Sequence, residues 1–395
     1  MWTLAAAAAC VVAGAAAGIV TGPAPAGGTE GVRVGAVYRP ETIGRSYRSC
    51  ERAASRVKVT GVRKATSIEG EWTAYADSGT GWTGGDSVHA YTLPAGGILW
   101  AFADSFLPPL NASGGRPFTA PLVHNLLVVQ SGTSFRLLVN GSLQYPSPLV
   151  NPTSSRDFYL TLAGAIEGET FQEILMEIHR LANGQFHWEQ SATVIATFAL
   201  PALNLVSVHR LSQPNLQIQW GAYLLHDGGY TYIYGASSRG SSRGMYVART
   251  RSTDLDDPWT YFDGRGWTTR ASAAAAIEYG VPPQFSVVPY DGMYILVASS
   301  LGAKFSNEVN VLAGCSPLGP FHLRSTFAAS YYVGPYAKSI YGSSEVWDYE
   351  AMDQAVLNKG HDLLVSYNRN SLDYWDLFRN AKLYRPGYLR VTLSR

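Results

Sequence analysis

Five glycine-led strand patterns recur along the chain and constrain its fold more than any other feature. The patterns begin at Gly97, Gly168, Gly229, Gly292 and Gly360. Each continues as an apolar or aromatic run and ends in small polar residues, and the pattern at Gly168 is the weakest match. They follow one another at intervals of about 60 to 70 residues, too long for one hairpin and too short for an independent domain. Units of this size are typical of four-stranded propeller blades, so the sequence predicts an all-β fold, a five-bladed β-propeller over residues 65–395 with an N-terminal extension.

The composition agrees with an all-β protein rich in turns. The 395 residues include 48 aromatic side chains (24 Tyr, 14 Phe and 10 Trp), which suit pleated surfaces, and 40 Gly with 21 Pro, which interrupt them. A β-sandwich is the alternative, but it would show turns every 8–12 residues or so without the longer repeat. The net charge of +1 gives no reason to expect nucleic acid as a partner.

The N-terminus carries the features of an export signal. Residues 4–20 form an uncharged apolar run, and Ala24-Pro25-Ala26 has the small-x-small form that signal peptidase accepts. We therefore expect residues 1–26 to be a signal peptide, the protein to be secreted, and no stable membrane insertion after cleavage. The first basic residue is Arg33, so a non-cleaved anchor is the alternative. Residues 27–64 are predicted to be a linker and lead-in segment.

Two cysteines remain once this segment is removed. In an exported protein Cys50 and Cys315 could form a disulfide that ties the lead-in to a distant part of the fold. Two separate buried thiols are the alternative, because the sequence does not give their distance.

Two aspartates, Asp86 and Asp104, stand where one predicted strand begins and another ends, in "GGDSVHAYTLPAGGILWAFADSFL". A propeller brings the ends of its inner strands to one funnel, so both side chains can meet there. Glycoside hydrolysis needs two such carboxyl groups, one as acid and one as base or nucleophile. Turn chemistry is the alternative, since Asp is common wherever a strand stops.

Seven segments of the chain resemble an exported propeller family labelled domain of unknown function 5005, and more distantly its 4185 relative. "WTGGD" at residues 82–86 and "DSF" at residues 104–106 are the most specific of them, within a match over about residues 70–393. The resemblance implies a five-bladed propeller related to arabinan-cleaving glycoside hydrolases, since members of the 4185 group are endo-D-arabinanases. Asp86 and Asp104 match the aspartates of two family motifs. Asp157 is the counterpart of an acid in a third motif, whose glycine and aromatic context this chain lacks.

A third carboxylate is expected from "GSSEVWDYE", in the last repeat. Glu345 precedes the strands of that repeat and has Trp347 nearby, and an apolar neighbour would raise its pKa and suit it as general acid. A surface glutamate in a serine-rich loop is the alternative.

Candidate ligand-binding residues lie beside turn signals. Aromatic rings can stack on the C–H faces of sugars, although most aromatic residues in such folds pack between blades. The polar pair in "PLVHN" is expected to face the axis and hold a water or a cation, or else to be hydrogen-bonded in the core. The candidates are Trp82, Trp220, Tyr279 and Trp347 among the aromatics, and His124 and Asn125 among the polar residues.

These features together predict an exported glycoside hydrolase that acts on a polysaccharide or oligosaccharide, with arabinan as the expected substrate. Asp86 is the expected base or nucleophile, Asp104 the second carboxylate or pKa modulator, and Glu345 the acid. No motif of an esterase, nucleotide-binding protein or zinc protease is present, and no cofactor is predicted, calcium being left open. The alternative is a non-catalytic propeller that binds carbohydrate or protein through the same funnel.

Overall fold

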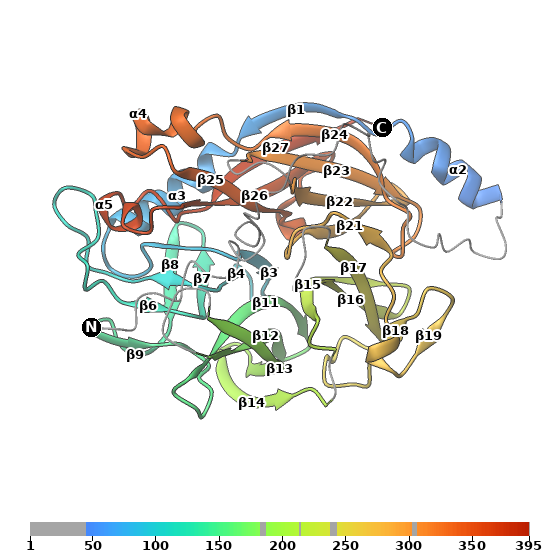
Figure 1. Ribbon diagram of the computed structural model, residues 1–395, viewed down its shortest axis with the longest axis horizontal. Coiled ribbons are helices and arrows are strands. Elements are labelled where there is room, and N and C mark those ends of the chain that lie inside the picture. The colour runs from blue at the N-terminus through green and yellow to red at the C-terminus, as the bar shows by residue number, and fades with distance from the viewer. Residues whose placement is uncertain (1–44, 182–186, 213–214, 238–242, 302–305, 395) are drawn as a thin grey trace, which may run out of the picture.

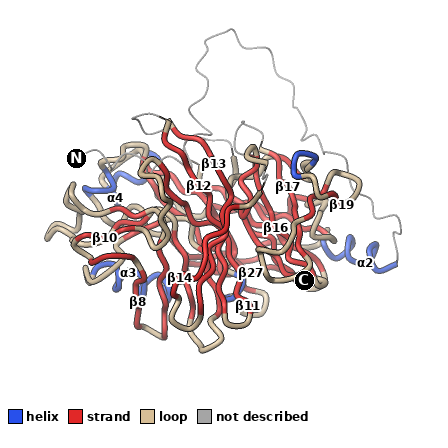
Figure 2. The backbone as a smooth tube through the Cα atoms, turned by 90° about the horizontal axis from the view of Figure 1, so that it is seen from below, coloured by secondary structure: helices blue, strands red, loops and turns tan. Residues whose placement is uncertain are grey.

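The computed structural model describes residues 45–181, 187–212, 215–237, 243–301 and 306–394. The predicted signal peptide, residues 1–26, lies outside the described residues. Strands dominate the part of the chain that is described, and the few helices lie at its periphery (Figure 2). The fold is therefore all-β, as the repeats and the composition predict.

Five antiparallel sheets of four or more strands follow one another along the chain and are arranged around a common centre (Figure 1). The strands are given in the order in which they are hydrogen-bonded: the first sheet comprises β3 (His89–Thr92), β4 (Ile98–Phe102), β7 (Leu126–Ser131) and β8 (Ser134–Leu138), and the second comprises β11 (Asp157–Glu167), β12 (Thr170–Arg180), β13 (Trp188–Ala199) and β14 (Asn204–Arg210). The third sheet comprises β15 (Ile218–Asp227), β16 (Tyr230–Ser237), β17 (Gly244–Thr250), β18 (Thr260–Phe262) and β19 (Trp267–Thr268), and β20 (Glu278–Tyr279) also pairs with β17. The fourth sheet comprises β21 (Ser286–Tyr290), β22 (Met293–Ser299), β23 (Glu308–Gly314) and β24 (His322–Ala328), and the fifth comprises β25 (Val346–Asp353), β26 (Asp362–Ser371), β27 (Gly387–Leu393) and β1 (Val59–Lys64).

Shorter elements connect or cover these sheets. They are the helices α2 (Arg45–Ala54), α3 (Thr66–Asp77), α4 (Lys338–Tyr341) and α5 (Asp376–Arg379); the 3-10 turns η1 (Ala271–Ala273), η2 (Gly334–Ala337) and η3 (Ala355–Leu357); the three-stranded group β2 (Gly84–Gly85), β5 (Ser105–Phe106) and β6 (Leu122–Val123); and the hairpin of β9 (Asn140–Ser142) and β10 (Tyr145–Ser147).

The repeated glycines occupy the same place in every sheet. Each one precedes the second strand of its sheet, in the turn from the first strand, and all have φ between 54° and 90°. Glycine adopts this left-handed region without the steric cost that a Cβ brings. The sequence repeat therefore marks one recurring turn of the architecture.

Hydrophobic cores lie between consecutive sheets. Separate apolar clusters join the first sheet to the second, the second to the third, the third to the fourth and the fourth to the fifth. A further cluster contains Trp100 and Val128 of the first sheet together with Leu364 and Tyr388 of the fifth. Because the last sheet also packs on the first, the five sheets form a ring around the centre, and their first strands are brought close to one another.

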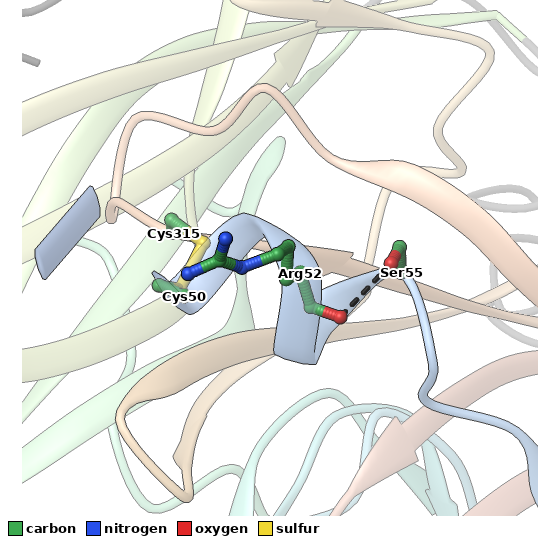
Figure 3. Close-up of a disulfide and its surroundings, with 4 residues drawn as sticks. All are labelled: Cys50, Arg52, Ser55 and Cys315. Atoms are coloured by element: carbon green, nitrogen blue, oxygen red, sulfur yellow. Dashed lines mark hydrogen bonds between the residues drawn. A yellow bond between two sulfur atoms is a disulfide. The ribbon is translucent and has the colours of Figure 1, made fainter. Parts of the chain in front are cut away.

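The lead-in segment completes this ring. Strand β1 pairs with β27 as the outermost strand of the fifth sheet, so the chain holds its last sheet together with residues from near its start. Cys50 in α2 is bonded to Cys315, which directly follows β23 of the fourth sheet (Figure 3). The structure thus contains a Cys50–Cys315 disulfide and not two separate thiols. Within the described residues, no helix is long and apolar enough to cross a membrane.

Candidate active site

Three carboxyl side chains line one narrow pocket where the five sheets meet. Asp86 lies between β2 and β3, Asp104 between β4 and β5, and Glu350 within β25. The pocket measures about 10 Å³, room for roughly one water molecule. Ser87, next to Asp86, also lines the pocket, and the second, third and fourth sheets or residues next to them add Thr161, Gln219 and Gln284.

Gly85 allows the backbones of the two aspartates to come together. Gly85 pairs with Ser105 across β2 and β5, and a Cβ at Gly85 would lie 2.3 Å from the Ser105 hydroxyl. The amide of Asp86 donates to the carbonyl of Asp104 at 3.2 Å. The close approach permitted by glycine therefore places the two carboxyl groups on adjacent backbone segments, as the sequence suggests.

Asp86 is anchored by two tyrosines from the fifth-sheet side of the pocket. The hydroxyls of Tyr349 and Tyr384 both donate to Oδ2 of Asp86 at 2.7 Å. Burial raises the pKa of Asp86 to about 7, and the negative charge of Asp104 acts in the same direction, while the two hydroxyl donors oppose the shift. Asp86 thus changes its charge near neutral pH.

Glu350 is held by a bulge in β25. The β25–β26 register shifts between Tyr349 and Met352, and Glu350 has φ of 49°, uncommon for a residue with a Cβ. Its Oε2 accepts from the amide of Ser87 at 3.1 Å and from Nδ2 of Asn368 at 2.7 Å. Burial, followed by the charge of Asp86, raises the pKa of Glu350 to about 8. Glu350 is therefore protonated at neutral pH.

Asp104 forms a pair with His124. Nδ1 of His124 lies 2.6 Å from Oδ1 of Asp104, and a guanidinium nitrogen of Arg180 lies 3.2 Å from Nε2 of the same ring. A guanidinium only donates, so Nε2 accepts and Nδ1 carries the proton that is donated to Asp104. Burial lowers the pKa of His124 to about 3, with the charge of Arg180 adding to it, and burial raises the pKa of Asp104 well above its usual range. His124 is therefore neutral at neutral pH and donates its Nδ1 proton to Asp104.

The predicted acid, Glu345, is not among the described residues that line the pocket. It precedes β25, and Glu350, five positions later in the same quoted stretch, is the glutamate that faces Asp86. The expectation that Glu345 reaches the funnel is therefore corrected: Glu350, which the sequence did not single out, lines the pocket instead. The bulge that turns Glu350 inward left no signal in the amino-acid pattern.

Two of the predicted sugar-stacking residues belong to the hydrophobic core instead. Trp82 is fully buried against Trp72 and Phe102, and Trp220 is buried against Tyr261. Neither ring presents a face to a ligand, because apolar side chains of neighbouring elements cover it. The expectation that Trp82 and Trp220 bind substrate is therefore corrected to core packing.

The side chains of the other two aromatic candidates are partly exposed to solvent. Trp347 is half-buried and stacks on Tyr349 at 4.5 Å between ring centroids, next to the hydroxyl that holds Asp86. Tyr279 is 41% exposed in β20, and it is not part of the pocket lining that the structure describes. Sugar binding by either residue stays a prediction.

Asn125 and Asp157 have structural partners. The Asn125 side chain bonds backbone groups of Val150 and Tyr159, which occupies its amide and corrects the expectation that it holds a water or a cation. Oδ1 of Asp157 lies 2.5 Å from Nδ1 of His179 across β11 and β12, and Asp157 is outside the pocket lining as described. His124, expected to bind a ligand, instead orients Asp104.

The comparisons with known proteins place the chain in a family. The profile of the family described as "Domain of unknown function (DUF5005)" matches residues 69–393. The chain belongs to the DUF5005 family. A search of curated proteins finds no match to it.

Solved structures similar to this DUF5005 chain were found by comparison. A putative hydrolase from Bacteroides ovatus aligns with a TM-score of 0.69 at 20% identity, over 86% of this chain and 94% of that one. An α-L-arabinofuranosidase from Podospora anserina aligns with a TM-score of 0.45 at 11% identity, over 80% and 93% of the two chains. One from Coprinopsis cinerea gives 0.46 at 12% identity, over 86% and 98%. At this identity the first match shows a common fold, whereas the TM-scores of the other two are too low to show one.

Sequence reasoning missed most groups that support the acids of this DUF5005 site. Tyr349, Tyr384 and Asn368 reach the carboxyls from the fifth sheet or the segment between its strands, about 260 to 300 residues away from Asp86 in the chain. Ring closure brings the two tyrosines to Asp86, whereas Asn368 and Glu350 lie on neighbouring strands of the fifth sheet. Among the described residues, no group of three or more His, Cys, Asp and Glu side chains is placed to hold a metal ion.

The buried acids predict a pH-dependent stability. Burial raises the pKa of Asp86 to about 7 and those of Glu173 and Glu350 to about 8, so the folded protein retains protons that the unfolded chain has lost. Burial lowers the pKa of His89 to about 4 and that of His124 to about 3. These two histidines therefore make stability rise with pH, mainly below about pH 6.5, where the unfolded chain protonates them. We expect the free energy of unfolding to fall by about 3 kcal/mol between about pH 6.5 and 8. Urea titrations across this range test it, and equal stability at both ends would contradict it.

Proposed function

We propose that this protein is a five-bladed propeller glycoside hydrolase. The observation that carries the proposal is the convergence of Asp86, Asp104 and Glu350 on one pocket. Each of the five sheets takes the part of a blade, since each packs on the next through its own core. Cleavage of a glycosidic bond requires an acid and a base or nucleophile at the same bond, which such a convergence supplies.

The surroundings of each acid suggest its role. Asp86 receives two hydroxyl hydrogen bonds, which favour its charged form, so it acts as base or nucleophile. Glu350 keeps its proton at neutral pH because of burial and the neighbouring Asp86, so it protonates the leaving oxygen. Asp104, oriented by His124, raises the pKa of Asp86 through its negative charge.

One oxygen of each acid is anchored by side chains of neighbouring elements. The anchored atoms are Oδ2 of Asp86, Oδ1 of Asp104 and Oε2 of Glu350. The hydrogen bonds that the tyrosines, His124 and Asn368 form with the three acids all use these atoms. Fixing one oxygen sets the orientation of the carboxyl group, and the other can bond a substrate oxygen or a water.

Arabinan or a related cell-wall polysaccharide is the substrate we propose, on the basis of the sequence resemblance to arabinan-cleaving propellers. Export is proposed from the apolar segment at residues 4–20 and from the Cys50–Cys315 disulfide, since such bonds persist in oxidising compartments. The narrow pocket favours a second candidate function, a non-catalytic propeller that binds carbohydrate without cleaving it.

Incubation with a panel of cell-wall polysaccharides, arabinan first, tests the proposal. Wild-type protein should release oligosaccharides, and Asp86→Asn should lower the rate by about 10² to 10⁴, the usual contribution of one acid–base group. Asp257→Asn, at an exposed aspartate, is the matched control and should keep the wild-type rate. Release that Asp86→Asn leaves intact would remove Asp86 from the mechanism, and binding without release from any polymer would favour the second candidate.

A further inference from the structure

Two exposed aromatic rings meet at the surface of the protein. Phe118, between β5 and β6, is 62% exposed, and Trp375, which directly precedes α5, is 50% exposed. Their ring centroids lie 5.2 Å apart at an interplanar angle of 84°. We call these two residues the rim platform. An edge-to-face pair leaves ring surface uncovered, and large exposed aromatic groups mark binding sites more often than chance.

A packed base holds the rim platform in place. Phe378 lies below both rings, 5.5 Å from Phe118 and 5.9 Å from Trp375, and itself packs on the buried Phe106. The fully buried Arg116 donates to the carbonyls of Leu377 and Ala381, which ties the loop of Phe118 to the segment of Trp375. The two rings are therefore presented by a fixed surface.

The segment that carries Trp375 also completes the carboxylate pocket. Residues 372–386 connect β26 to β27, and the hydroxyl of Tyr384 in this segment binds Asp86. Tyr374 lies next to Trp375, and its pKa is raised by burial and by the negative charge of Asp104, which places this end of the segment near the acids as well. The segment that carries Trp375 is thus tied to the carboxyl groups through Tyr384.

Polar groups at the edge of the platform complete a surface suited to sugars. Arg379 in α5 forms ion pairs of 2.8 Å with Asp373 and Asp376, and the Arg379 and Asp373 side chains remain largely exposed. Sugar rings combine apolar C–H faces, which stack on aromatic rings, with hydroxyls that bond charged groups at the periphery. A protein partner would be expected to bury a larger apolar patch than two rings.

We propose that the rim platform binds a sugar unit of the polysaccharide chain away from the bond that is cleaved, so that the protein prefers polymers to short oligosaccharides. This inference rests on the proposed function. It assigns the platform a contribution to affinity for the chain, while the three acids perform the cleavage.

Binding is measured first, in an Asp86→Asn background where cleavage does not interfere. Trp375→Ala and Phe118→Ala should each weaken binding of arabinan about ten-fold in calorimetric titrations, while Trp375→Phe should retain most of the affinity because a ring remains. Tyr145→Ala is the matched control, an aromatic residue 75% exposed in the separate β9–β10 hairpin. Wild-type affinity in both alanine variants, with thermal unfolding unchanged, would overturn the proposal.

Activity separates this inference from the proposed function. In otherwise wild-type protein, Trp375→Ala should lower kcat/KM for arabinan about ten-fold and leave that for an arabinobiose-sized substrate unchanged. Full activity of Trp375→Ala on the polymer would overturn the platform while the cleavage function stands. Binding that depends on Trp375 without any cleavage would support the platform and end the case for hydrolysis. A dimer that Trp375→Ala dissociates, with glycan binding intact, would assign the surface to self-association and overturn the proposal.

Discussion

Replacement of Glu350 by Gln should lower kcat on the polysaccharide substrate by about 10² to 10⁴. Glutamine has nearly the same size and can still accept hydrogen bonds from the amide of Ser87 and from Asn368, so the bulge in β25 should keep its shape. It cannot deliver a proton, however, to the leaving oxygen. Initial rates of reducing-end release, measured at several pH values, give the size of the loss.

Glu345→Gln provides the matched comparison for this prediction. Glu345 lies five residues earlier, is part-buried, and is outside the pocket lining that the structure describes, so kcat should remain close to that of the wild type. The basic limb of the wild-type pH–rate profile should follow deprotonation of Glu350, whose pKa is raised to about 8. Full activity in Glu350→Gln, or a large loss in Glu345→Gln, would reverse the assignment.

Removal of the disulfide should lower the free energy of unfolding by about 2 to 5 kcal/mol. The bond joins residues 265 positions apart and thereby restricts the unfolded chain. It also holds α2 on the fourth sheet, directly before β1 enters the fifth sheet, so its loss frees the segment that completes the ring. Denaturant titrations of the Cys50→Ser/Cys315→Ser double variant measure the change.

Reduction supplies the control for the disulfide. Dithiothreitol should destabilise the wild type to the level of the double variant and should leave the double variant itself unchanged. A wild-type free energy of unfolding in the double variant would show that β1 and the apolar contacts of α2 hold the lead-in without the covalent bond.

The turns of the architecture could be predicted from the sequence because one local requirement repeats. A left-handed turn between the first two strands selects glycine in every sheet, so Gly97, Gly168, Gly229, Gly292 and Gly360 recur at similar intervals. The adjacency of Asp86 and Asp104 was predictable for a similar reason, since they stand at strand ends within one short segment.

The rest of the site depends on tertiary structure that leaves little local trace. Glu350 faces the pocket because of a bulge, and an alternating strand pattern does not reveal where the register shifts. Trp82 and Trp220 stand beside turn signals, yet both fill cores between sheets, and sequence alone does not separate a buried ring from one that binds sugar. The tyrosines that hold Asp86 reach it only when the fifth sheet meets the first.

The central claim is that Asp86, Asp104 and Glu350 act together on a single glycosidic bond. A crystal structure of Glu350→Gln soaked with an arabino-oligosaccharide tests it most directly. We expect a glycosidic oxygen within hydrogen-bond distance of the amide side chain introduced at position 350 and an anomeric carbon facing Asp86. A sugar chain bound elsewhere, with the three side chains remote from every glycosidic bond, would contradict it.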